Sequence, residues 1–131
     1  MLAAHGLLPG SSAINKSVMN QTLSSVLAQW DWTSGMGWDY PLMALTAARL
    51  GRSDVVRILL FKQNDSNCGN QYLMQGWAPM QGQHGPYFPA NGGLLLAVGM
   101  AVGGWAGAQP LAGLPEDWRP HVRAEGFRPY L

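Results

Sequence analysis

The chain contains few charged residues. Asp, Glu, Lys and Arg make up 11% of its 131 residues, against roughly 25% in an ordinary soluble domain. Its eight basic and seven acidic residues are scattered and leave a formal net charge of +1. A nucleic-acid-binding protein needs a basic patch that neutralises phosphates, so nucleic acid is not expected as a partner. With 47% hydrophobic residues, the chain is expected to be covered in part by another surface.

Cysteine and histidine are also scarce. Cys68 is the only cysteine, which excludes a disulfide within the chain and leaves a thiol that we expect to be passive. The three histidines are dispersed, and none pairs with another at metal-ligand spacing. We therefore expect no metal site built within the chain, and no cofactor.

Long hydrophobic runs are missing as well. The longest, residues 94–106, contains several glycines and is shorter than the roughly 20 residues that span a membrane. Residues 1–13 are partly apolar, but no basic residue precedes the apolar stretch and His5 interrupts it, which is a weak pattern for a secretory signal. We expect no membrane span and no signal peptide, and the compartment stays open.

What the sequence does contain is helical periodicity between glycine- and proline-rich segments. Residues 16–30 carry apolar side chains at helical spacing with polar ones opposite, and VVRILLFKQ at 55–63 has a similar pattern, so both predict one-faced helices. Residues 40–50 and 92–105 are apolar or small on nearly every side, which predicts buried helices. The proline-broken C-terminal tail is expected to be irregular or a short β-strand.

The boundaries of these helices carry familiar signals. Asp39 is a plausible N-cap for the helix that starts at Tyr40, and Pro41 falls in the first turn, where a missing N–H costs nothing. After this helix, Gly51 can adopt the left-handed conformation of a helix C-terminus. Ser53 can then cap the next helix, so LGRSD predicts a tight turn between two helices.

One-faced and all-apolar helices therefore alternate along the chain. This order predicts an all-α domain of αα-hairpins that form part of an (α/α)6 barrel or toroid, with residues 1–131 as a single, partial domain. The inner helices of such a ring run parallel, so the loops that precede them open on one rim. Here those loops are residues 31–39 and 63–91.

These loops hold the candidate substrate-binding residues. An aromatic ring offers a flat apolar platform for the C–H face of a sugar, and amide or imidazole groups can orient hydroxyls. The candidates are Trp30, Trp32, Trp38, Trp77, His84, Tyr87 and Asn91. Packing between hairpins is the more common role for each tryptophan alone, and only their clustering favours a site.

Asp39 and Asp31 are the candidate catalytic residues. A carboxylate at a helix N-terminus is held rigid and ionised, which suits a base or an orienting group. Partial burial of Asp31 between tryptophans would favour the protonated form that a general acid needs. Capping by Asp39 and simple solvation of Asp31 are the alternatives. Glycoside hydrolysis commonly uses two carboxyl groups, about 5 Å apart for retention or about 6.5 to 9.5 Å for inversion.

Three segments, AQWDWTSGMGWDYPLMALTAARLGR, YFPANGGLLLAVGMAVGGW and VRAEGFRP, resemble the C-terminal part of bacterial six-hairpin glycoside hydrolases. The nearest group is the family 95 α-L-fucosidase-like proteins. The resemblance extends from about Lys16 onward and implies an (α/α)6-barrel catalytic domain that acts on glycans.

Two departures from that family shape the expectation. Six hairpins need roughly 300 residues, so this chain resembles a C-terminal segment without the part that brings the general acid. Fucosidase-like members carry an aspartate in a DGNFGG-type segment, whereas this chain has Pro89 and Ala90 before Asn91.

We expect a glycan-binding portion of a glycoside hydrolase, with the missing N-terminal part of the barrel or a second copy as partner. The alternative is a non-catalytic, truncated relative that acts as a carbohydrate-binding or self-associating helical module.

Overall fold

The computed structural model describes residues 2–32, 36–61 and 88–130. Within these ranges the helices are α1 (Ala3–Gly6), α2 (Lys16–Gln29), α3 (Asp39–Arg49), α4 (Ser53–Phe61) and α5 (Phe88–Gly103), followed by a 3-10 helix, Arg119–His121. The expected all-α class is confirmed for the part of the chain that the structure describes. None of its helices is both long and apolar enough to cross a membrane.

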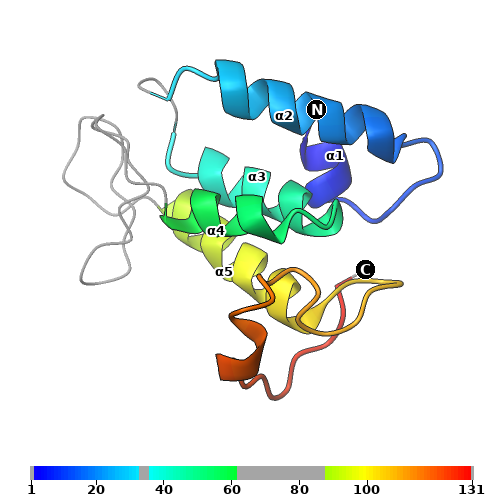
Figure 1. The fold of residues 1–131 in the computed structure, drawn as a ribbon, viewed down its shortest axis with the longest axis vertical. Coiled ribbons are helices and arrows are strands. Elements are labelled where there is room, and N and C mark those ends of the chain that lie inside the picture. The colour runs from blue at the N-terminus through cyan, green and yellow to red at the C-terminus, as the bar shows by residue number, and fades with distance from the viewer. Residues whose placement is uncertain (1, 33–35, 62–87, 131) are drawn as a thin grey trace.

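Helix α3 lies at the centre of the core (Figure 1). It contacts α1, α4 and α5 closely and α2 to a smaller extent. Its small and apolar side chains are buried on nearly every side, as the sequence predicted. Leu23 from α2, Leu59 from α4 and Met100 from α5 join α3 in the main hydrophobic cluster. Helix α2 buries only one face, also as predicted, because Met19 and Leu23 are its buried residues.

Helices α3 and α5 run side by side in the same direction (Figure 1). At their first turns they are so close that a methyl group added to Gly93 would lie 2.9 Å from Pro41 Cγ. Near their last turns, Ala48 and Ala101 both lie against Gly113. The N-termini of α3 and α5 and the C-terminus of α2 therefore share one end of the molecule, which we call the aromatic end.

The turn between α3 and α4 has the predicted glycine geometry. Gly51 has a φ of 76°, and its N–H donates to the Ala48 carbonyl at 2.9 Å. The Arg52 N–H donates to the Ala47 carbonyl, also at 2.9 Å, which completes a Schellman motif. The prediction for Ser53 was wrong: it is the first helical residue, and the Arg52 carbonyl accepts the first helical bonds.

Helix α5 differs from its prediction in two ways. It begins at Phe88 instead of Gly92, since Pro89 fits the first turn of a helix. It is also not buried around its whole circumference, because Leu95 is 74% exposed and Val98 is 39% exposed. A helix that is apolar on all sides contains no pattern that shows which side is covered, so the sequence could not reveal this face.

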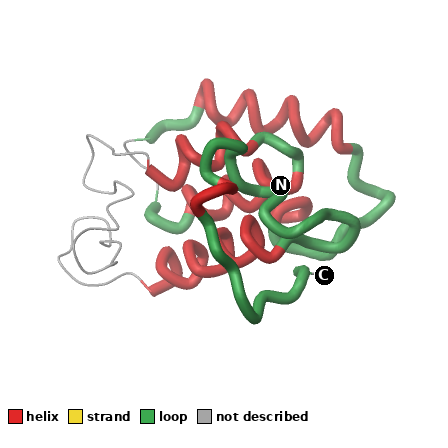
Figure 2. The backbone as a smooth tube through the Cα atoms, turned by 60° about the horizontal axis from the view of Figure 1, so that its bottom comes forward, coloured by secondary structure: helices red, strands yellow, loops and turns green. Residues whose placement is uncertain are grey.

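The C-terminal tail takes the irregular form that was expected and contains no β-strand among its described residues. It is mostly irregular (Figure 2), but Trp105 and Tyr130 form an isolated parallel β-bridge. Tyr130 donates its N–H to the Gly104 carbonyl at 2.9 Å and accepts from the Ala106 N–H at 2.8 Å. Its hydroxyl also donates to the Leu7 carbonyl at 2.8 Å, which joins the tail to the N-terminal segment.

The N-terminal segment docks against α3 through polar contacts. The Thr46 hydroxyl donates to the Leu2 carbonyl at 3.0 Å, and the Arg49 guanidinium donates to the Leu8 carbonyl. Between them, the His5 side chain is only 4% exposed. Its burial, together with the positive charge of Arg49, lowers the pKa of His5 below its usual 6.5.

This histidine makes stability depend on pH. Below about pH 6.5 an unfolded chain binds a proton at His5, while the folded chain with its lowered pKa resists protonation. The unfolded state then carries more protons, so the free energy of unfolding should fall as the pH drops from 7.5 to 5.5. Urea midpoints measured across this range test the effect. His5→Gln should flatten the profile, and an unchanged slope in this variant would contradict the assignment to His5.

Candidate functional site

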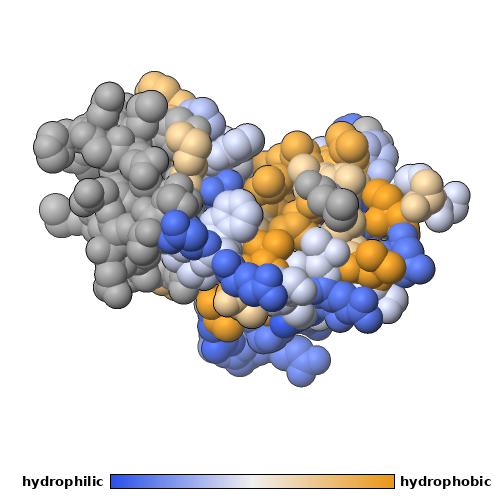
Figure 3. All heavy atoms as spheres, turned by 90° about the horizontal axis from the view of Figure 1, so that it is seen from above, coloured by the Kyte–Doolittle hydropathy of each residue, from blue (hydrophilic) through white to orange (hydrophobic). Residues whose placement is uncertain are grey.

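An apolar groove at the aromatic end brings two of the candidate residues together. Asp39 and Trp30 line a hollow of about 200 Å³. The rest of its wall comes from α1, α2 and α3, through Leu2, Ala3, Thr22, Val26, Leu42 and Met43. Figure 3 views the molecule from the side of α1 and α2, where apolar side chains reach the surface between hydrophilic ones. The groove thus combines an aromatic side chain, aliphatic walls and one carboxylate.

The Asp39 carboxylate is fixed in a different way from the one expected. Asp39 is not the N-cap but the first residue of α3, and Trp38 occupies the cap position without a capping side-chain bond. One carboxylate oxygen, Oδ2, accepts the Met36 N–H at 2.8 Å. This bond holds the carboxylate against the preceding turn, so the rigidity expected from capping is supplied by a turn instead.

The tryptophans of the first loop have separate positions. Trp32 stacks on Tyr40, with ring centroids 5.5 Å apart and an interplanar angle of 30°. Because Tyr40 is only 1% exposed, this stacking makes Trp32 a partner of the core. Trp30 and Trp38 are instead 41% and 45% exposed. They offer the apolar surface that a sugar ring can contact.

Of the other candidate site residues, the structure describes two and leaves three outside the described ranges. Asp31 is exposed. Asn91 is half-buried in the first turn of α5, at the same end as Asp39. Trp77, His84 and Tyr87 lie outside the described residues.

Sequence reasoning missed the contribution of α1 to the groove. Leu2 and Ala3 form part of its wall, but a helix of 4 residues is too short to show a 3.6-residue period. The only available signal was the apolar stretch at the N-terminus. Among the residues placed in the structure, no three His, Cys, Asp or Glu side chains form a group that could hold a metal ion.

No protein-family model, curated protein or solved structure matches the chain.

Proposed function

We propose that this chain is the C-terminal portion of an (α/α)6-barrel glycoside hydrolase domain and that its aromatic end lines the sugar-binding cleft. The observation that carries the proposal is the meeting of Asp39 and Trp30 in one apolar groove. The parallel course of α3 and α5 supports it further, because it directs both helix N-termini to this end, as the inner helices of such a barrel do.

The groove offers the two kinds of contact that a sugar requires. The exposed face of Trp30 can stack on the C–H face of a pyranose ring. The Asp39 carboxylate can accept hydrogen bonds from sugar hydroxyls, and such charge-assisted bonds are stronger than neutral ones. Since the Met36 N–H already fixes one oxygen of Asp39, little side-chain freedom is lost when the sugar binds.

The chain alone is expected to bind a glycan without cleaving it. Common glycoside hydrolysis requires a carboxyl group on each side of the scissile bond, and Asp39 is the one carboxylate among the described residues that line the groove. In this proposal the general acid comes from the rest of the barrel. Asp39 then orients the sugar or acts as a base.

The alternative, a self-associating or carbohydrate-binding module without catalysis, is favoured by one observation. Phe88, Leu95 and Val98 are exposed on α5 and lie at helical spacing on one side. Such an apolar face is commonly covered by a partner surface. Light scattering after size-exclusion chromatography distinguishes the two proposals. A defined oligomer favours a self-associating module, and ill-defined aggregation favours a segment of a glycoside hydrolase barrel.

Two substitutions test the proposed groove. In a calorimetric titration with an oligosaccharide that binds the wild-type chain, Trp30→Ala should weaken affinity about tenfold, or about 1.4 kcal/mol, because the stacking face is lost. Asp39→Asn keeps the shape but loses the charge-assisted bond, and it should weaken binding by about 1 kcal/mol.

The matched control is Phe127→Ala, which removes an aromatic side chain that is 52% exposed and lies outside the groove. Its affinity should equal that of the wild type. Equal affinities for all three variants and the wild-type chain would place the sugar elsewhere and contradict the proposal.

A further inference from the structure

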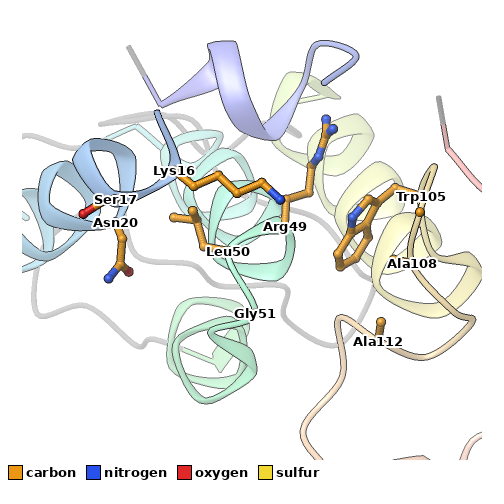
Figure 4. Close-up of a pocket in the computed structure, with 10 residues that line it drawn as sticks. Lys16, Ser17, Asn20, Arg49, Leu50, Gly51, Trp105, Ala108 and Ala112 are labelled. Atoms are coloured by element: carbon orange, nitrogen blue, oxygen red, sulfur yellow. The ribbon is translucent and has the colours of Figure 1, made fainter. Parts of the chain in front are cut away.

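A second hollow lies at the opposite end of the helices, where α2 begins and where α3 and α5 end. It has two parts that share lining residues: a smaller one of about 150 Å³ and a wider one of about 550 Å³. Lys16, Arg49 and Trp105 line both parts. In Figure 4 the Lys16 side chain extends from α2 toward Arg49 on α3, and the Trp105 indole faces them from beyond α5. We call this the cationic hollow.

The charge of the hollow is uncompensated within the part of the chain that the structure describes. No Asp or Glu is among the described residues that line either part. The ion pairs among the described residues are Arg57–Asp117 and Arg123–Glu125, so neither Lys16 nor Arg49 is paired there. Arg49 is also only 9% exposed, and a buried cation without a counter-ion is costly. An anion in the hollow would reduce that cost.

A buried histidine supplies an independent sign of a missing partner. His5 lines the smaller part of the hollow and is 4% exposed, yet its Nε2 atom has no hydrogen-bond partner among the described residues. Buried polar atoms in proteins are nearly always satisfied. His5, Lys16 and Arg49 all line this smaller part of the hollow.

We propose that the cationic hollow binds a small tetrahedral oxyanion, a phosphate or sulfate group. Arg49 and Lys16 supply the positive charge and the N–H donors that such an anion requires. Arginine suits this ligand because its planar group presents paired donors to such oxygens. The wider part of the hollow can admit the organic portion of a phosphate monoester. This site is separate from the aromatic end and does not depend on the proposed glycan function.

The test is a titration of the full chain with sodium sulfate, inorganic phosphate and glycerol phosphate, each at constant ionic strength. Because Trp105 lines both parts of the hollow, tryptophan fluorescence can report binding, and calorimetry can confirm it. A saturable response is expected, with a Kd of about 1 mM or lower. Tighter binding of glycerol phosphate than of inorganic phosphate would identify a phosphate monoester as the ligand, and equal or weaker binding would identify the free ion.

Two variants make the test specific. Lys16 is exposed, so Lys16→Gln should leave the fold intact, as circular dichroism can verify, while it weakens anion binding about tenfold. The control is Arg123→Gln, which removes one positive charge at a side chain that is 89% exposed and outside the hollow; its Kd should match the wild type. A titration without saturation, or an equal loss of affinity in both variants, would overturn the proposal. Arg49 would then serve only to hold the N-terminal segment, through its hydrogen bond to the Leu8 carbonyl.

Discussion

Replacement of Leu59 by alanine is expected to destabilise the fold by about 2 to 5 kcal/mol. Leu59 is fully buried and belongs to the main cluster with residues of α2, α3 and α5. Its loss removes apolar contacts and leaves a cavity that the surrounding helices can fill only in part. Because the whole domain is expected to be stable by about 5 to 15 kcal/mol, the change should lower the urea midpoint strongly.

The neighbouring residue provides a matched control. Ile58 is on the same helix but is 56% exposed, and the change Ile58→Ala should alter the free energy of unfolding by no more than about 0.5 kcal/mol. Urea denaturation followed by circular dichroism measures both variants. Similar losses for Leu59→Ala and Ile58→Ala would mean that α4 does not pack as described.

The second large effect is expected where α1 crosses α3. A methyl group added to Gly6 would lie 2.5 Å from Thr46 Oγ1 and 2.7 Å from the Thr46 backbone nitrogen. A side-chain oxygen can rotate away, but a backbone atom within a buried helix cannot move without shifting its neighbours. Gly6→Ala should therefore cost about 1 to 3 kcal/mol, the usual range for overpacking.

Gly92 offers the opposite expectation for the same substitution. It lies in α5, where a methyl group would meet no atom within 4 Å among the described residues outside its own stretch of helix. Alanine is favoured over glycine in a helix interior by about 0.8 to 1 kcal/mol, so Gly92→Ala should stabilise the chain. Thermal and urea unfolding of the two variants should move in opposite directions. A stabilising effect of Gly6→Ala would refute the close contact between α1 and α3.

The sequence predicted which face is buried in the helices whose apolar residues lie on one side. Residues 16–30 place Met19 and Leu23 on one side, and the structure buries that side of α2. The same reasoning failed for α5, since its apolar residues point in every direction and only tertiary contacts decide that Leu95 stays exposed. It also failed for the N-terminal segment, whose single helical turn carries no period and is held by contacts with Thr46 and Arg49.

The structure brings two of the candidate residues, Asp39 and Trp30, together in one groove. The clustering of aromatic residues near Asp39 is what predicted a site at this end of the molecule. It could not distinguish Trp32, which stacks on Tyr40, from Trp30, which lines the groove. That difference depends on a contact between a loop and α3. The position of Asp39 within its turn likewise depends on the Met36 N–H, which no capping rule specifies.

The central claim is that the aromatic end binds sugar, and one titration tests it most directly. Neutral oligosaccharides of varied monosaccharide and linkage are added to the folded wild-type chain while tryptophan fluorescence is recorded. We predict that at least one of them changes the emission saturably, and that Trp30→Ala removes most of that change. If no oligosaccharide alters the emission of a chain that circular dichroism shows to be folded, the groove is not a sugar site and the proposed function is wrong.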